Sequence, residues 1–211
     1  MAICELLNIS KSFKSKNIFD NFSLKIEEGD FVCITGESGT GKSTLLNMIG
    51  LLESPDKGMI NLCGYNDVKI SSKIAQQILR NKIGFLFQNF GLIDDKSVGD
   101  NLDIVCKNTS IPKTKWKHKQ EEILQELQLN VSLTQKVYNL SGGEQQRVAL
   151  ARLLLKNCEI ILADEPTGSL DVSNRNLVLD ILDRLNQAGK TIIIVTHDPY
   201  IVNRYKNIIK L

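Results

Sequence analysis

The sequence is short of three features: long hydrophobic runs, paired cysteines and an excess of charge of one sign. No stretch approaches the ~20 apolar residues of a membrane span, so we expect any membrane role to depend on a partner. The amino terminus carries an early acid, Glu5, and lacks the basic-then-apolar layout of a secretion signal. Lysine and arginine total 26 against 24 acidic residues, and the net charge of +2 argues against nucleic acid as a main partner.

The five cysteines are scattered along the chain and form no CxxC pair. Cys33 and Cys158 lie in or beside apolar runs, where a free thiol behaves as a small buried hydrophobe. This usage predicts reduced thiols in the cytoplasm and argues against a disulfide framework or a zinc site. With 211 residues, 42% of them hydrophobic, and no repeats, the chain suits one sizeable globular domain.

Residues 31–46 are organised as a short apolar strand, a glycine-rich turn and the start of a helix. Within this stretch, residues 36–43 match the phosphate-loop pattern of Gly, four residues and Gly-Lys-Ser. Glycines let successive backbone amides turn inward around a polyphosphate, and the following helix directs its unpaired amides at the same anion. Lys42 is expected to reach the β- and γ-phosphates and the hydroxyl of Ser43 to ligate Mg²⁺. The alternative is a turn that binds nothing. The predicted nucleotide-binding residues are Gly36, Glu37, Ser38, Gly39, Thr40, Gly41, Lys42, Ser43 and Thr44.

A second apolar strand, IILADE at 160–165, ends in two acids. The carboxyl ends of strands are where open α/β sheets bind ligands. Asp164 is predicted to hold the hydration shell of Mg²⁺, and Glu165 to polarise an attacking water. In isolation such a strand more often runs into a solvated turn.

A second anion site is predicted at Ser141-Gly142-Gly143, where a hydroxyl and bare glycine amides begin a helix. One chain cannot easily wrap this site and the phosphate loop around one phosphate if a helical lobe separates them. Two chains arranged head-to-tail with two-fold symmetry can do so.

Alternation of strands and helices predicts an α/β fold with a mostly parallel sheet flanked by helices. Residues 3–9 and 17–26 are expected to form antiparallel strands joined by a polar turn at 11–17. Further strands are expected at 58–63, 83–87, 159–163 and 191–195, helices at 42–52, 71–82, 98–107, 113–129, 143–156 and 173–188, a weak helix at 132–137, and a short helix and strand within 199–211. We therefore expect one domain over 1–211, with the core and antiparallel region in 1–88 and 141–211 and a helical subdomain at about 89–140.

Four motifs in order resemble the nucleotide-binding cassette of an ABC transporter: the phosphate loop, LSGGEQ at 140–145, ADEPTGSLD at 163–171 and Thr196-His197-Asp198. The resemblance covers nearly the whole chain. It implies a phosphate-loop NTPase core with a small antiparallel β subdomain and an inserted helical subdomain. It also implies ATP and Mg²⁺ as cofactors and ATP hydrolysis as the activity, in the class of translocases.

The family's roles transfer residue by residue as implications of this resemblance. Ser141 and Gly143 would bind the partner chain's ATP, and Asp171 would close across the dimer. The adenine-stacking aromatic would be Phe13, which could otherwise pack on the antiparallel strands. Implied catalytic residues are Lys42, Gln88, Glu165 and His197, and implied metal-binding residues are Ser43, Gln88 and Asp164. Without the resemblance, His197 would be a capping or core histidine and Gln88 a solvated turn residue.

Within the family, the chain resembles the group of lipoprotein-releasing, macrolide-exporting and cell-division ATPases. Residues 87–102 particularly resemble ATPases of bacteriocin or antimicrobial-peptide exporters. The group implies a nucleotide-bound homodimer on the inner face of the cell membrane, with a permease that contacts Gln88–Ser97. An ATPase of the cell-division type, which drives a mechanotransmitting complex without transport, remains an alternative.

Other classes are disfavoured by what the sequence contains and omits. Ribosome-associated relatives carry two cassettes, and DNA-repair relatives carry a long coiled coil. A non-hydrolysing subunit would not need both Glu165 and His197. The end of the sequence at Leu211 predicts no C-terminal regulatory domain and argues against a sugar importer. The basic run at 113–119, with Trp116, is expected to be the solvated face of a helix, relieved by nearby acids.

Overall fold

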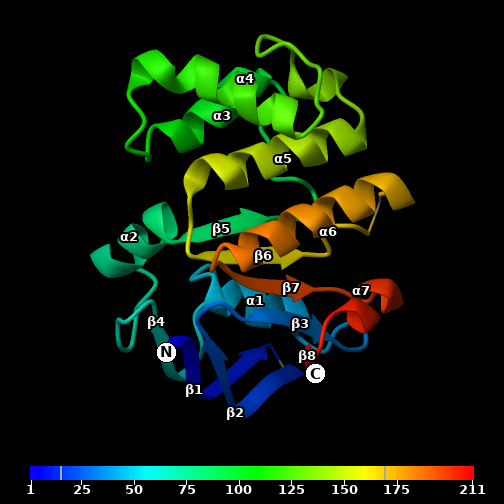
Figure 1. Cartoon of the computed structure of the whole chain (residues 1–211). Helices are drawn as coiled ribbons and strands as arrows, with labels where there is room; N and C mark the ends of the chain where they lie inside the picture. Colours follow the sequence, from blue (N-terminus) through cyan, green and yellow to red (C-terminus); the bar gives the residue numbers. More distant parts are fainter. Residues whose placement is uncertain (15, 169) are drawn as a thin grey trace.

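The computed structural model describes residues 1–14, 16–168 and 170–211. Ser15, in the predicted turn, and Ser169, in the 163–171 motif, lie outside the described residues. Two sheets form the framework (Figure 1). The larger is parallel, in the order β5-β6-β7-β3-β8, and the smaller is antiparallel, in the order β2-β1-β4. The predicted fold class is therefore confirmed.

The strands of the parallel sheet are short and almost entirely apolar. They are β3 (Phe31–Thr35), β5 (Ile83–Leu86), β6 (Ile160–Asp164), β7 (Thr191–Val195) and β8 (Asn207–Lys210). All five residues of β7 and four of the five in β6 are buried. Continuous apolar runs of this kind are typical of parallel strands that are covered on both faces.

Alternate residues of each central strand enter two different hydrophobic clusters. In β6, Ile161 and Ala163 join the cluster formed with helices α3 to α7, whereas Ile160 and Leu162 join the cluster formed with α1, α2 and the antiparallel sheet. The helices are α1 (Lys42–Ile49), α2 (Lys73–Asn81), α3 (Val98–Cys106), α4 (Trp116–Glu126), α5 (Gly142–Lys156), α6 (Val172–Gln187) and α7 (Pro199–Arg204). The period of two in a strand thus makes the sheet a shared wall between two cores.

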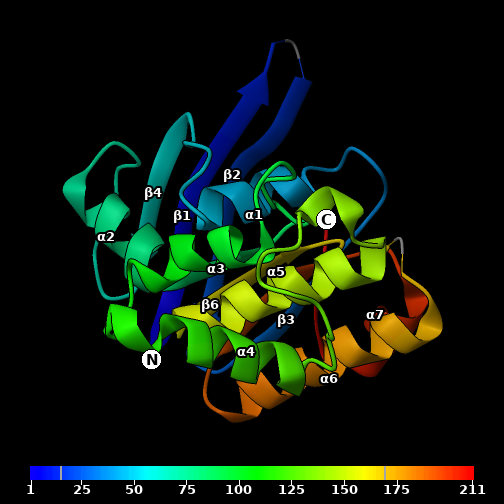
Figure 2. The same cartoon turned by 90° about the horizontal axis from the view of Figure 1, so that it is seen from above.

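The antiparallel sheet consists of β1 (Ala2–Phe13), β2 (Lys16–Glu27) and β4 (Lys57–Leu62). Its first two strands are longer than predicted and extend beyond the rest of the chain as a hairpin (Figure 2). The turn predicted at 11–17 was too long, because β1 continues to Phe13 and β2 begins at Lys16. Lys11 lies within β1 and is only 7% exposed, because its amine contacts the Ser54 carbonyl oxygen at 2.8 Å and the Asp56 carboxylate at 3.4 Å.

The helical region packs α3 and α4 on α5 (Figures 1 and 2). The helix predicted over 113–129 is shorter: a single 3₁₀ turn (Lys113–Lys115) precedes α4, and Gln128 after α4 has a left-handed backbone. The helix predicted at 132–137 was wrong. This segment accepts the backbone amides of Val98 and Gly99, at the start of α3, on the carbonyls of Gln135 and Leu133, which holds it in turns. Only Val137–Asn139 forms a 3₁₀ turn.

Within the described residues, no helix combines the length and the apolar character that crossing a bilayer requires.

Gly58, within β4, and Gly64, just after β4, allow a matched test of the packing of the antiparallel sheet. Gly58 and Gly64 both have left-handed backbones, with φ of 92° and 83°. A Cβ at Gly58 would lie 2.5 Å from the carbonyl oxygens of Leu7 and Asn8, whereas one at Gly64 would meet nothing within 4 Å. We expect Gly64→Ala to lower the free energy of unfolding by about 1–2 kcal/mol from backbone strain alone. Gly58→Ala should cost about 1–3 kcal/mol more, because the backbone of β1 must move. Urea denaturation measures both, and equal losses would contradict the predicted clash.

Candidate functional site

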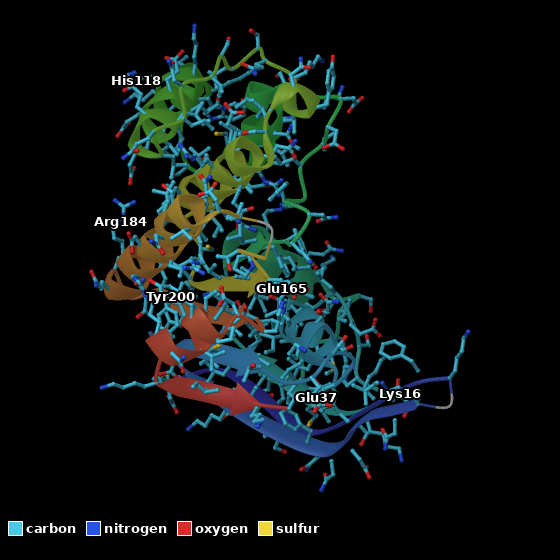
Figure 3. All side chains as sticks on the ribbon, turned by 90° about the vertical axis from the view of Figure 1, so that its right-hand side faces the viewer. Lys16, Glu37, His118, Glu165, Arg184 and Tyr200 are labelled. Atoms are coloured by element: carbon cyan, nitrogen blue, oxygen red, sulfur yellow. The ribbon has the colours of Figure 1, made fainter. Side chains whose placement is uncertain are left out.

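A cleft of about 820 Å³ lies at the carboxyl end of the parallel sheet, beside the hairpin. Figure 3 shows that Glu165, Glu37 and Lys16 reach this side of the molecule from three different elements. The lining consists of Phe13, Lys16, Ile18, Gly36, Glu37, Ser38, Gly39, Gly41, Lys42, Ser43, Thr44, Gln88, Glu165, Val195 and His197. The structure therefore brings together predicted site residues from the hairpin, the phosphate loop, the end of β5, and the ends of β6 and β7.

The phosphate loop connects β3 to α1 and depends on glycine at several positions. A Cβ at Gly36 would lie 2.5 Å from the backbone oxygen of Leu211. Gly39 and Gly41 have φ of 80° and 100°, which L-residues rarely adopt. A Cβ at Gly41 would also collide with the side chain of Ile18 on the hairpin. Gly41 caps α1 without a side-chain hydrogen bond, so the first amides of the helix have no capping side chain and suit an anion.

The amine of Lys42 lies across this loop. It donates hydrogen bonds to the carbonyl oxygens of Gly36 at 2.9 Å and Glu37 at 2.7 Å. The hydroxyl of Thr40, which does not line the cleft, donates to the same Glu37 carbonyl at 3.0 Å. The loop therefore holds its cation at the turn where a polyphosphate is predicted to bind.

The acid at the end of β6 meets the first turn of α1. The Ser43 hydroxyl donates to the carboxylate of Asp164 at 3.3 Å. Burial raises the pKa of Asp164 above its usual range, and the nearby charge of Glu165 adds to this, although the hydrogen bond from Ser43 and the charge of Lys42 act the other way. A half-buried carboxylate of this kind is stabilised by a cation. The hydroxyl of Ser43, the carboxylate of Asp164 and the amide oxygen of Gln88 are hard oxygen donors of the type that suits Mg²⁺.

Glu165 is oriented by contacts with the end of β7. Its φ of 43° is left-handed, an unusual conformation for a residue other than glycine. One carboxylate oxygen lies 2.6 Å from Nδ1 of His197, and the other accepts a hydrogen bond from the Thr196 hydroxyl at 3.2 Å. The Glu165 side chain is 13% exposed and the imidazole 74% exposed. A carboxylate held in this way beside a phosphate-binding loop can act as a general base for water.

The signature turn, Ser141-Gly142-Gly143, does not line this cleft. Ser141 caps α5, and both its amide and its hydroxyl donate to the carboxylate of Glu144 at 2.8 Å. These two donors lower the pKa of Glu144. Ser141 and Gly142 are exposed to solvent. Of the predicted nucleotide-binding residues, the structure thus leaves Ser141, Gly142 and Gly143 outside the cleft, together with Thr40 and Asp171.

Phe13 is the last residue of β1, and its ring is 45% exposed at the cleft. The amine of Lys11 lies 4.9 Å from the centre of the ring. This exposure favours the stacking role over packing on the antiparallel strands. The structure also places Lys16 on the cleft, where its amine donates to the Gly39 carbonyl oxygen at 2.9 Å. Sequence reasoning missed Lys16, although its position in the hairpin next to Phe13 could have indicated it.

The basic run at 113–119 lies far from this cleft, as the position of His118 in Figure 3 shows. Lys119 pairs with Glu122 at 3.0 Å and Lys117 with Glu121 at 3.9 Å. The indole of Trp116 donates to the Ile111 carbonyl oxygen at 2.9 Å. These contacts agree with the expected solvated helix face and with relief of its charge by neighbouring acids.

Comparisons with known proteins agree with this geometry. Residues 19–168 match the family model described as ABC transporter. The lipoprotein-releasing system ATP-binding protein LolD of Aquifex aeolicus is 42% identical over 192 residues, which cover 90% of this chain and 85% of LolD. The macrolide export ATP-binding/permease protein MacB of Campylobacter jejuni is 40% identical over 206 residues. These cover 98% of this chain but only 32% of MacB, so the chain spans about a third of the length of that relative.

Solved structures give the same result. An ATP-binding cassette described as a dimer in a post-hydrolysis state, bound to ADP and Pi, superimposes with a TM-score of 0.89 and 35% identity. The match covers 99% of this chain and 94% of that one. The chain therefore belongs to the ABC transporter family, as an ATP-binding and ATP-hydrolysing domain of the group that contains MacB and LolD.

Proposed function

We propose that two copies of this chain bind two molecules of MgATP at a shared head-to-tail interface and drive an export permease. One observation carries the proposal. The residues expected to hold nucleotide are divided between a cleft and the exposed turn at Ser141, which lies outside it. A second copy would supply its turn to the open side of the first copy's cleft, and two-fold symmetry would complete both sites. The similar cassette solved as a dimer with ADP and Pi supports this arrangement.

Within each site, the residues have separate roles. The phosphate loop and Lys42 would bind and neutralise the β- and γ-phosphates, and Phe13 would stack on adenine. Ser43, Asp164 and Gln88 would hold Mg²⁺, which supplies charge neutralisation at the phosphate oxygens. Glu165 would accept a proton from water as the water oxygen forms a bond to the γ-phosphorus and the bond to the ADP oxygen breaks. His197, already in contact with Glu165, would stabilise the departing γ-phosphate.

Binding of nucleotide would favour the closed pair over the open one. A ligand that contacts both copies binds the closed arrangement more tightly than the open one, and this difference in affinity shifts the equilibrium toward closure. Asp171, at the start of α6, would lie near the two-fold axis. Hydrolysis would remove the γ-phosphate that both copies contact and so allow the pair to reopen.

We place the permease at a cavity of about 510 Å³ next to the predicted contact at Gln88–Ser97. It is lined by Gln76, Leu79, Arg80, Gly84, Phe85, Phe87, Ile104, Val105, Asn108, Arg152, Leu153 and Lys156. This lining is largely apolar and has three cations but no acid. Burial lowers the pKa of Lys156, whose amine donates to the Leu79 carbonyl oxygen at 2.7 Å. An apolar segment with a carboxylate would complement the cavity in shape and charge.

The permease would hold the chain at the inner face of the cell membrane. The names of the relatives favour export, since MacB is a macrolide export protein and LolD belongs to a lipoprotein-releasing system. The likeness of residues 87–102 to peptide exporters narrows the proposed substrate to a bacteriocin or antimicrobial peptide. Recognition of that substrate would lie in the permease, because the cassette's cleft is built for nucleotide.

Glu165→Gln tests the dimer and the catalytic base together. The amide keeps the shape of the side chain but cannot accept the proton, so hydrolysis should fall about 10²–10⁴-fold while ATP still binds. The variant should then elute as a dimer on size exclusion with ATP and as a monomer without it. Glu159→Gln, at the opposite end of β6, should retain the parent's rate, because its pair with Lys82 is partly exposed to solvent. Unchanged hydrolysis would refute the role of Glu165, and absence of the ATP-dependent dimer would refute the head-to-tail proposal.

Asp164→Asn should have opposite effects on the stability of the protein and on its binding of MgATP. The ionised carboxylate is disfavoured by burial, so removal of its charge should raise the thermal unfolding midpoint of the nucleotide-free protein. The rise should be small, since the carboxylate is partly exposed and solvent screens its charge. Calorimetry should also show weaker binding of MgATP but little change in binding of ATP with a chelator. Asp100→Asn is the control, because hydrogen bonds from Ser97 favour its ionised form and its loss should lower the midpoint. A lower midpoint for Asp164→Asn would contradict the burial argument.

Arg80→Glu tests the permease cavity through an exposed residue of its rim. Reversal of the charge should repel the proposed carboxylate and reduce by several-fold the membrane protein that co-purifies with the chain from its native host. Lys73→Glu, on the same helix but outside the cavity, should co-purify as the parent does. Equal recovery with both variants would place the permease elsewhere.

A further inference from the structure

One side-chain amide, that of Asn174, connects the signature turn and Asp171, which are far apart in the chain. Asn174 lies in the first turn of α6, and its Nδ2 donates to the carboxylate of Asp171 at 2.6 Å. Its backbone amide donates to the other oxygen of Asp171 at 2.9 Å. These donors lower the pKa of Asp171, which shows that the contact stabilises the ionised carboxylate.

The oxygen of the same amide accepts a hydrogen bond from Arg147 of α5 at 2.8 Å. The guanidinium of Arg147 also donates to the carbonyl oxygen of Gln128, after α4, at 3.0 Å. The side-chain N–H of Asn174 therefore bonds to Asp171, just before α6, and its side-chain oxygen bonds to Arg147 of α5, the helix that begins with the signature turn. Arg147 extends the connection to the helical region.

Asn174 also packs directly against the signature turn. A Cβ added at Gly143 would lie 2.9 Å from Nδ2 of Asn174 and 3.2 Å from its Cγ. The backbone at Gly143 and the amide of Asn174 are thus in contact, with no room for a side chain between them. Movement of the signature turn toward α6 would displace Asn174, and through it Asp171.

A second link joins α5 to the residue after Glu165. Gln146 is only 1% exposed, and its amide donates to the carbonyl oxygen of Pro166 at 2.8 Å. The first two turns of α5 are therefore bonded to both ends of the segment 166–171. One of these bonds comes directly after Glu165, and the other, through Asn174, reaches Asp171.

We propose that Asn174 is a positioning residue that couples the two ATP sites of the dimer. The inference rests on the head-to-tail arrangement proposed above, in which Ser141 and Gly143 of one chain contact the partner's nucleotide while Glu165 acts on the chain's own nucleotide. Contact between the signature turn and the partner's γ-phosphate is transmitted through Asn174 to Asp171 and the segment that follows Glu165. The bond from Gln146 holds Pro166, so the signal reaches Glu165 through the residue that directly follows it.

The chemistry of the amide dictates a graded set of variants. Asn174→Ala loses both the donor to Asp171 and the acceptor for Arg147. Asn174→Asp keeps an acceptor for Arg147 but places a carboxylate against that of Asp171, so it should break only the link to that residue. Ser173→Ala is the matched control, because Ser173 is an exposed neighbour in the same turn.

The experiment measures ATP hydrolysis against ATP concentration for the parent and the three variants. The parent should be cooperative, with a Hill coefficient well above 1. Both Asn174 variants should lower the Hill coefficient to about 1 and kcat about tenfold, the factor expected for loss of one hydrogen bond to a charged group. Affinity of the monomer for MgATP, measured by calorimetry below the concentration at which dimers form, should stay within twofold. Ser173→Ala should match the parent in every measurement.

Arg147→Ala and the double variant Arg147→Ala/Asn174→Ala complete a double-mutant cycle in which the rate of ATP hydrolysis is measured. If both residues belong to one connection, the double variant should be no slower than the slower single variant, whereas independent roles would multiply the losses. A non-cooperative parent, cooperative Asn174 variants, or a double variant with multiplied losses would each overturn the inference. Failure of the proposed function would appear separately, as a Glu165→Gln protein that stays monomeric with ATP. A thermal unfolding transition checks that each variant is folded. If Asn174→Ala does not fold, Asn174→Asp serves as the test.

Discussion

The parallel pairing of β3, β7 and β6 is the constraint on which the site depends. Parallel strands end at the same edge of a sheet, and the register places Val195 opposite both Ile34 and Asp164. The turn after each strand therefore begins at the same level, which brings together the phosphate loop, the acids of β6 and Thr196. Because alternate residues of these strands pack in two different hydrophobic clusters, a one-residue slip of the register would exchange the side chains of the two cores and disrupt the packing of both. The hydrophobic cores thereby fix the positions of the charged groups.

The second constraint is the separation between the cleft and the start of α5, which one chain cannot bring together. Helix α5 belongs to the cluster that packs against one face of the sheet, and its amino-terminal turn emerges at the surface outside the nucleotide cleft. The chain therefore contains two helix starts whose amides we propose to bind phosphate, and they face different surroundings. The contacts of Gln146 with Pro166 and of Arg147 with Asn174 keep α5 in a defined relation to the acids of β6 despite this separation.

The sequence could predict those parts of the fold and site that depend on local patterns. Apolar runs located β5, β6 and β7 within about one residue, and glycine spacing located the phosphate loop, since both signals are contained in a few consecutive residues. The strand near the end of the chain, β8, was predicted only as part of 199–211. The failures involve contacts between distant segments. Lys11 looked like a turn residue because its acidic partners are more than 40 positions away, and the helix expected at 132–137 is replaced by turns that bind the start of α3. Asn174 drew no attention because only the fold places it against Gly143.

The capping of α5 has a consequence for how long two copies would stay together in the proposed dimer. The hydroxyl and amide of Ser141 are already satisfied by Glu144 in the single chain. A phosphate oxygen that took either donor would replace an existing acceptor, so the net gain in free energy would be smaller than that of a newly formed bond. Affinity assembled from such exchanges favours rapid separation once part of the ligand is gone. A short residence time of the proposed pair would let each copy release its products and take up fresh nucleotide.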